Sequence, residues 1–497
     1  MRIYNQKRLT SHGNVEGRRM ALDIIEAGLS AADPYRNAKK LVQIENGRLM
    51  IGCPDFEPEG SPRTGIDCFE LGQDVERIFI FGAGKGIQRA VLALEEVLGD
   101  YLTGGHVIVK HGDGIILKKV AVTEGGHPVP DEACAEGCRQ MKAEIESLHF
   151  TKRDLVFTIV GNGVSSLLTL PPAGVSLGDV GSITRILQIE KGLVTTKLNM
   201  VRNQIDQLKG GRITRLLYPA RMIHLILTDA NEKNSFGDSG YHGLTYSNSW
   251  LHTLPDISRT DMARTCLDEC GAWERMPLPV QRYFEQDAYK NPGLTREEFE
   301  QMDCRIYGIM PGKKNYLDAA MEKAKEFGFS PVLLSRKTFT EARETGAFTA
   351  QIAKTIELEH SPFSPPCALF LTGELLVKVD GETGIGGRNQ EFALAAAQVI
   401  RGSGGITVAA VDTDGTDGPG GRFHPEAWRM GCHTLAGGVT DGETWEEALR
   451  KGEDIPLALK RHDTSAALWN LDSGIWAAQN ISVCDLIVVL VCCPAYN

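Results

Sequence analysis

Glycine-rich turns that follow apolar strands constrain the fold of this chain more than any other feature. The apolar stretches are Arg77–Phe81, His106–Lys110, Asp154–Val160 and Met222–Leu227. The first runs into Gly82-Ala83-Gly84-Lys85-Gly86, and the third runs into Gly161-Asn162-Gly163-Val164-Ser165-Ser166. Strands that alternate with helices predict an α/β fold with a doubly wound, Rossmann-like parallel sheet. Such sheets bind ligands at the carboxyl ends of their strands, so we expect a binding site at these turns.

A polar, helical stretch at residues 256–300 separates two α/β patterns. The second pattern begins at Arg305, and its expected elements are strands at 368–372, 376–380, 406–411 and 485–491 and a helix at 392–400. We therefore predict three parts. Residues 1–255 form an N-terminal Rossmann-like domain, residues 256–300 a helical connector, and residues 301–497 a second α/β domain.

Composition excludes several classes of protein. The net charge of 53 − 64 = −11 argues against a nucleic-acid binder, although one Lys or Arg and backbone N–H groups can still hold a phosphate. Twelve cysteines in 497 residues are too few for a disulfide scaffold and fit a reducing compartment. No apolar run reaches the roughly 18 residues of a membrane span. We expect a cytoplasmic protein without nucleic-acid or membrane partners, and we leave its oligomeric state open, a homodimer included.

Lys85 is the unusual member of the first turn. It stands at the start of a predicted helix, where the helix dipole is already positive, so an anion is needed to neutralise both charges. This arrangement favours a clamp for a phosphate or carboxylate, with a solvated lysine at an ordinary turn as the alternative. Gly82 and Gly84 match only part of a dinucleotide fingerprint, because Ile87 stands where the third glycine belongs.

The turn at 161–166 offers glycines, two hydroxyl groups and backbone N–H groups after a strand, as a phosphate cradle does. A tight strand-to-helix turn explains the same residues equally well. Lys209 precedes two glycines that can cap a helix, and its side chain can also point into a cleft. We interpret His127-Pro128-Val129-Pro130-Asp131 as a structural turn, and His462-Asp463 stays ambiguous.

Two further motifs lie in the second half of the chain. Gly384-Ile385-Gly386-Gly387-Arg388-Asn389-Gln390-Glu391 opens a predicted helix, and Arg388 presents a bidentate donor for a carboxylate or phosphate. Asp412-Thr413-Asp414-Gly415-Thr416-Asp417 places three carboxylates within six residues after a strand. Oxygen ligands at this density suit Mg²⁺, and helix capping or Asx turns are the alternative.

Taken in order, these motifs resemble the MOFRL-type (class II) glycerate 2-kinase family. The matching segments are GAGK at 82–85, GGHPVPDEA at 125–133, NMVRNQIDQLKGGR at 199–212, GIGGRNQEFALA at 384–395 and DTDGTDGP at 412–419. The resemblance covers residues from about 15 to 490. It implies a two-domain α/β kinase with its active site between the domains, which transfers the γ-phosphate of ATP to the 2-hydroxyl of D-glycerate with Mg²⁺.

The resemblance also implies roles for particular residues. Lys85 and Arg388 are expected to be catalytic, and Asp229 is the candidate that orients or deprotonates the substrate hydroxyl. Asp414 and Asp417 are the expected metal ligands. The residues expected to contact the cofactor are Gly82, Gly84, Gly161, Asn162, Gly163, Ser165, Ser166, Lys209, Gly386, Gly387, Asn389, Gln390 and Glu391.

Three loops depart from the family pattern. The usual GGGSA loop reads GNGVSS at 161–166, the segment after Asp229 lacks the SGPT sequence, and Ala478–Val483 replaces a Thr-Gly-Thr-Asn-Val type of loop. These changes indicate an altered pocket or a divergent paralogue. Two alternatives stay beside the kinase: an NAD(P)H-dependent hydroxypyruvate reductase, suggested by the partial G-x-G of Gly82 and Gly84, and a non-catalytic protein that binds a nucleotide or sugar acid, suggested by the changed loops.

Overall fold

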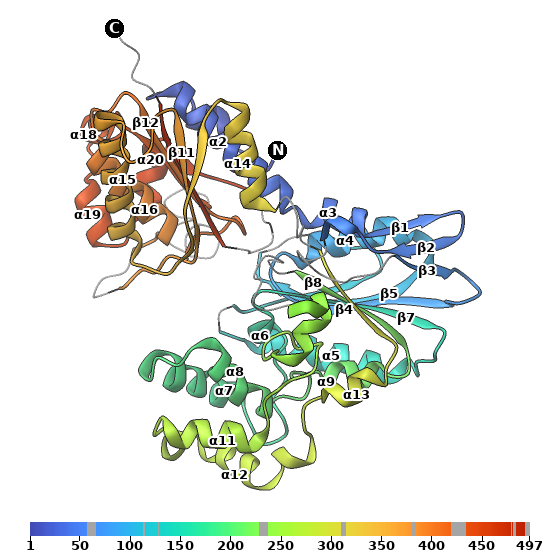
Figure 1. Ribbon diagram of the computed structural model, residues 1–497. Coiled ribbons are helices and arrows are strands. Elements are labelled where there is room, and N and C mark those ends of the chain that lie inside the picture. Colours follow the sequence, from blue (N-terminus) through green and yellow to red (C-terminus); the bar gives the residue numbers. More distant parts are fainter. Residues whose placement is uncertain are drawn as a thin grey trace. The chain divides into compact units, whose positions relative to one another are not determined.

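The chain forms two compact units in the computed structural model, shown in Figure 1. One unit is Pro34–Lys313, and the other combines Met1–Asp33 with Lys314–Asn497. The structure describes residues 1–56, 66–112, 115–127, 129–227, 237–309, 315–379, 384–418, 434–478, 480 and 484–492. Within these residues, no helix has the length and apolar character needed to cross a bilayer.

The unit Pro34–Lys313 is built on a six-stranded sheet in which all neighbouring strands are parallel. Its strands are β4 (Arg77–Ala83), β5 (Leu102–Lys110), β6 (Ala121–Gly125), β7 (Asp154–Gly161), β8 (Arg221–Leu227) and β9 (Cys304–Gly308). They are arranged in the order β6-β5-β4-β7-β8-β9, which is the Rossmann strand order. The prediction of a doubly wound parallel sheet is thereby confirmed.

Helices and a small antiparallel sheet surround this parallel sheet. The three-stranded sheet consists of β1 (Val42–Glu45), β2 (Arg48–Ile51) and β3 (Asp67–Glu70). The helices are α3 (Pro34–Leu41), α4 (Ile87–Leu98), α5 (Glu132–Ser147), α6 (Val164–Leu167), α7 (Leu177–Thr184), α8 (Thr195–Arg202), α9 (Arg212–Leu217), α11 (Thr260–Glu269), α12 (Leu278–Gln286) and α13 (Arg296–Glu300).

The stretch predicted as a connector, 256–300, is part of this unit. Its helices α11 and α12 lie beside α7 and α8 (Figure 1). The four helices share a separate apolar core. Buried side chains of this core include Leu198, Leu267, Val280 and Phe284. The polar residues that suggested a linker are the outer faces of these amphipathic helices.

The boundary of the second domain also differs from the prediction. The stretch at Arg305, predicted to open that domain, is strand β9 and pairs in parallel with β8 at the edge of the first sheet. A short apolar strand carries no information about which sheet it joins, so the sequence pattern could not assign it.

The second unit contains a mixed six-stranded sheet in the order β10-β11-β15-β12-β13-β14. The strands are β10 (Ser330–Thr338), β11 (Cys367–Gly373), β12 (Ile406–Asp412), β13 (Gly437–Asp441), β14 (Gly474–Ile475) and β15 (Asp485–Val491). Among the strand pairs that the structure describes in this sheet, β10–β11 is the parallel one, and β15 lies antiparallel between β11 and β12. The predicted strand at 376–380 is absent over its described residues, since Leu376 makes only an isolated bridge to Glu341.

Helices cover both faces of the mixed sheet (Figure 1). They are α1 (Gln6–Leu9), α2 (Val15–Ala31), α14 (Tyr316–Glu326), α15 (Ala342–Glu359), α16 (Arg388–Ile400), α18 (Thr444–Lys451), α19 (Ile455–Lys460) and α20 (Thr464–Asn470). Helix α2, which the predicted boundaries placed in the first domain, packs on β12, β15 and α14. The fully buried Arg18 of α2 forms an ion pair with Asp441 at the end of β13.

Candidate active site

The turns after β4 and β7 meet at the carboxyl edge of the parallel sheet. The backbone N–H of Lys85 donates to the carbonyl of Asn162 over 2.8 Å. Gly84 lies against Gly161, where a Cβ on Gly84 would come within 2.7 Å of the Gly161 nitrogen. Because β4 and β7 flank the point at which the strand order reverses, these turns occupy the usual ligand position of a Rossmann sheet.

Lys85 and His127 both lie against Gly163. A Cβ on Gly163 would be 3.0 Å from Cγ of Lys85 and 3.1 Å from Nε2 of His127. Gly163 also has a φ of +81°, which favours glycine. The structure thus places His127, from the turn after β6, beside the predicted catalytic lysine. The sequence pattern did not identify His127, because its proline-rich neighbourhood was explained by a turn.

Asp131, four residues after His127, is anchored through its carboxylate. Its Oδ1 accepts a hydrogen bond of 3.0 Å from the Cys134 backbone at the start of α5, and its Oδ2 lies 2.6 Å from Nε2 of His111. Burial acts to raise the pKa of Asp131, but hydrogen bonds from His111, Gly126 and Cys134 outweigh it and lower this pKa to about 2. These contacts fix Asp131 at the start of α5.

The serines of the second turn contact protein groups. The Ser165 hydroxyl lies 2.9 Å from Nε2 of His252, and Arg202 donates to the Ser165 carbonyl over 2.7 Å. Lys209 lies behind this turn and is only 1% exposed. Its Nζ contacts Oδ2 of Asp206 at 2.6 Å and the Thr169 hydroxyl at 2.8 Å. In this structure Lys209 therefore joins two segments within the core. Asp229 lies outside the described residues.

In the second unit, Arg388 bridges two carboxylates on neighbouring strands. Asp412 and Asp485 are directly opposite each other in the β12–β15 pair. Nε of Arg388 lies 2.8 Å from Oδ1 of Asp485, and Nη2 lies 2.8 Å from Oδ2 of Asp412. Like charges opposite each other destabilise a sheet, and the guanidinium offsets this repulsion. Burial nevertheless raises the pKa of Asp485 to about 6, against the opposing effect of Arg388.

Asp417 caps the helix that Arg388 begins. It is fully buried, and its two oxygens accept hydrogen bonds from the backbone N–H groups of Asn389 (3.1 Å) and Gln390 (2.9 Å). Asp414 accepts from the Thr416 backbone over 2.7 Å, as in an Asx turn. Among the described residues, no group of three or more His, Cys, Asp or Glu side chains is placed to hold a metal ion.

Asn389 and Gln390, expected to contact the cofactor, are fully buried. The Asn389 amide donates to Asp485 over 2.8 Å. The Gln390 side chain donates to the Asp417 carbonyl and accepts from the Ser465 hydroxyl over 2.7 Å. Both side chains therefore support the loops around Arg388.

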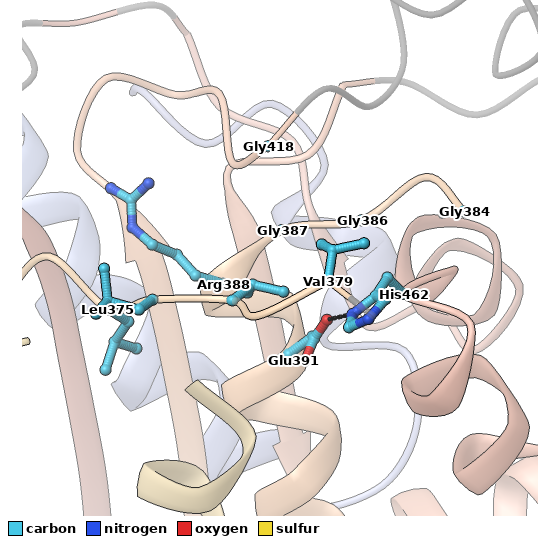
Figure 2. A pocket seen from close by; sticks show the side chains of 11 residues that line it. Leu375, Val379, Gly384, Gly386, Gly387, Arg388, Glu391, Gly418 and His462 are labelled. Carbon is cyan, nitrogen blue, oxygen red and sulfur yellow. Dashed lines mark hydrogen bonds and ion pairs between the residues drawn. The ribbon is translucent and has the colours of Figure 1, made fainter. Parts of the chain in front are cut away.

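A cavity of about 540 Å³ lies beside Arg388 (Figure 2). It is lined by Leu375, Leu376, Val377, Val379, Gly384, Gly386, Gly387, Arg388, Glu391, Gly418 and His462. A Cβ on Gly386 would lie 2.4 Å from the Thr464 hydroxyl oxygen, and one on Gly387 would lie 2.3 Å from the Asp417 carbonyl oxygen. These two glycines thus let the loop pack closely on its neighbours while its backbone lines the cavity.

Comparison with known proteins assigns the class. One family model, described as "Domain of unknown function (DUF4147)", matches residues 20–285, and a second, the MOFRL family, matches residues 367–480. A D-glycerate 2-kinase of Thermotoga maritima is 32% identical, with 92% of this chain and 99% of the relative covered. A glycerate 2-kinase of Pyrococcus horikoshii is 28% identical over 90% of this chain and 93% of the relative. A putative hydroxypyruvate reductase of Agrobacterium vitis is 29% identical over 84% and 99%.

The fold agrees with this assignment. The crystal structure of a glycerate kinase from Thermotoga maritima matches with a TM-score of 0.69 at 28% identity, covering 95% of this chain and 99% of that one. The fold and the matched models define a two-unit α/β protein with a MOFRL region. The chain belongs to the glycerate 2-kinase family, as its motifs predict.

Proposed function

We propose that this chain is an ATP-dependent kinase that phosphorylates the 2-hydroxyl of D-glycerate or a closely related small 2-hydroxy acid. The observation that carries the proposal is the placement of Lys85 at the reversal point of a Rossmann sheet. There its cation can face a phosphoryl group. Phosphoryl transfer depends chiefly on positioning and electrostatic stabilisation, which Lys85 and Arg388 can supply.

The residues around Arg388 fit a role for Mg²⁺. Asp412, Asp414 and Asp485 outnumber the single guanidinium, so an anionic substrate needs an additional cation there. Mg²⁺ binds through one or two carboxylates together with phosphate oxygens, and Asp414, in the turn that follows β12, can supply one of these carboxylates. Bound Mg²⁺ would neutralise charge on the phosphates. Asp417 fits less well, because both of its oxygens cap α16.

The remaining roles follow the chemistry of the acceptor. Arg388 would hold the transferring group or the substrate carboxylate while Asp412 and Asp485 fix its orientation. Asp229 stays the predicted group that orients the acceptor hydroxyl. In this proposal Lys85 and Arg388 both act on the phosphoryl group or the acid during one transfer. We also retain the expectation of a cytoplasmic location.

The test is release of ADP from MgATP over a panel of 2-hydroxy acids that includes D-glycerate and L-glycerate. We expect turnover with D-glycerate. In the ³¹P spectrum, a phosphate on C2 couples to one proton, whereas one on C3 couples to two. Absence of turnover with every acid on the panel would reject the kinase. A product phosphorylated on C3 would keep the kinase and reject the 2-hydroxyl as its target.

A hydroxypyruvate reductase is the second candidate, supported by the partial G-x-G of Gly82 and Gly84. Oxidation of NADH or NADPH with hydroxypyruvate, followed at 340 nm, tests it directly. The absence of any change with both nicotinamides rules the reductase out. A reductase would also tolerate Lys85→Ala better than a kinase would, because hydride transfer develops no phosphoryl charge.

A further inference from the structure

The cavity beside Arg388 has an apolar wall that a three-carbon acid does not need. Leu375, Leu376, Val377 and Val379 form this wall. Leu376 is 52% exposed and Val379 is 47% exposed, so part of the wall faces solvent. Every carbon of glycerate carries a polar group, and burying these side chains against it would gain little. The wall therefore indicates a ligand with an apolar face.

The size of the cavity points the same way. Its volume of about 540 Å³ lies in the range of sites that enclose drug-sized ligands, roughly 300–1,000 Å³. A nucleoside is a ligand of that class, with a flat apolar base and a small number of polar groups. The cavity also borders the cationic and acidic groups that a phosphate chain with Mg²⁺ would need, namely Arg388 with Asp412 and Asp485.

A second polar group lines the cavity apart from the Arg388 guanidinium. Nδ1 of His462 lies 2.6 Å from Oε1 of the buried Glu391, as Figure 2 shows. A carboxylate can only accept, so the ring donates to Glu391 from Nδ1, and in the tautomer that carries its single proton there Nε2 is an acceptor. Arg343 lies 3.2 Å from Oε2 of Glu391 and balances its charge. His462 thus offers a fixed acceptor for a ribose hydroxyl or an amino group.

We propose that this cavity binds the adenosine part of the nucleotide. The apolar wall packs on the purine, His462 accepts a hydrogen bond from the nucleoside, and the phosphates extend toward Arg388. This inference rests on the proposed kinase function, but nucleotide binding can be measured without turnover.

The experiment is calorimetric titration of the full chain with MgADP, for the wild type and for Leu376→Asp and Val379→Asp. Both side chains are exposed, so each variant should fold, which a thermal melt checks. Leu358→Asp is the matched control, because Leu358 is 71% exposed on α15 of the same unit and does not line the cavity. We expect MgADP to bind at least 10-fold more weakly to the two cavity variants and unchanged to the control.

Kinetics separate this inference from the proposed function. We expect the KM for ATP to rise at least 10-fold in the cavity variants and the KM for D-glycerate to change less than 2-fold. Unchanged MgADP affinity in both variants overturns the inference, and so does a rise in the KM for D-glycerate alone, which assigns the cavity to the acid. If the wild type binds MgADP, Leu376→Asp weakens that binding as expected, and no acid is phosphorylated, the adenosine site is supported and the proposed kinase function is rejected.

Discussion

The two candidate site regions carry opposite balances of charge. Around Lys85 cations dominate, since Arg202 and Lys209 lie behind the neighbouring turn and Asp206 pairs with only one of them, Lys209. Around Arg388 carboxylates dominate. The parallel sheet thus presents a region that can take phosphoryl oxygens directly. The mixed sheet presents one that suits a phosphate only together with a metal cation.

The glycines in the two regions differ as well. Gly163 leaves room for the side chains of Lys85 and His127, whereas Gly387 leaves room for the backbone and carboxylate of Asp417. Glycine next to a functional residue therefore serves two purposes. At Gly163 it leaves space for functional side chains, and at Gly387 it lets the loop pack closely on Asp417. The following variants separate the two regions.

Arg388→Ala should have the largest effect on activity and on stability, because we assign Arg388 a catalytic role and because its guanidinium pairs with two carboxylates. We expect kcat to fall on the order of 10³-fold, as on loss of a transition-state donor. We also expect a loss of about 3–5 kcal/mol of stability, since Asp412 and Asp485 would face each other unbridged. Arg388→Lys should regain part of the stability and little of kcat, because an ammonium lacks the planar fork whose separate nitrogens reach the two carboxylates. A kcat within 10-fold of wild type in Arg388→Ala would contradict this role.

Lys85→Ala should separate catalysis from stability. We expect kcat to fall about 10²–10³-fold. Because the side chain is only half-buried, the midpoint of thermal unfolding should stay within about 2 °C of wild type. Lys152→Ala, at an exposed lysine of the same unit, is the control and should keep full activity. Equal losses of stability in Lys85→Ala and Arg388→Ala would contradict the expectation that Arg388, unlike Lys85, also stabilises the fold.

Asp485 should make stability depend on pH. Burial raises its pKa from 3.8 to about 6, so between these values the folded chain holds a proton that the unfolded chain releases. Its contribution to the free energy of unfolding therefore falls as pH rises from about 4 to 6, by on the order of 2 kcal/mol. Asp485→Asn should reduce this slope in urea titrations at pH 4, 5 and 6, and the buried Asp417, whose pKa is also raised, keeps its own share. A slope identical to that of wild type would mean that another group titrates there.

His127→Asn tests the neighbour of Lys85. We expect the KM for ATP to rise about 10-fold, or roughly 1.4 kcal/mol, with little change in unfolding temperature. His111→Asn, which weakens the hold on Asp131 without removing the imidazole at 127, should have a smaller effect on the same KM. If His111→Asn proves the more damaging of the two, His127 acts only as part of the turn.

Asp414 and Asp417 should separate metal binding from capping. Asp417→Asn removes part of the cap of α16 and should cost about 1 kcal/mol of stability without changing the Mg²⁺ concentration for half-maximal activity. Asp414→Asn should raise that concentration about 10-fold at nearly unchanged stability. If Asp417→Asn instead raises the Mg²⁺ requirement and Asp414→Asn lowers the stability, Asp417 is the metal ligand.

The sequence predicted the parallel sheet and the family, because strand and turn patterns are local and the motifs are specific. It did not predict the partner of β9 or the location of α2, which depend on contacts between distant segments. It assigned Asp417 from a run of carboxylates and Asn389 and Gln390 from a family motif, whereas burial directs these side chains into the protein. His127 and the Glu391–His462 pair come close to their partners only through folding, so no spacing in the sequence marked them.

The unit that contains the mixed sheet combines two stretches of chain that are synthesised at very different times. Helix α2 leaves the ribosome hundreds of residues before β12 and β15, against which it packs. At 5–20 residues per second, it waits on the order of tens of seconds for its place. The Rossmann unit between them can fold in that interval. The apolar face of α2 and the buried Arg18 must stay protected until Asp441 arrives, so this helix is where we expect the nascent chain to need a chaperone.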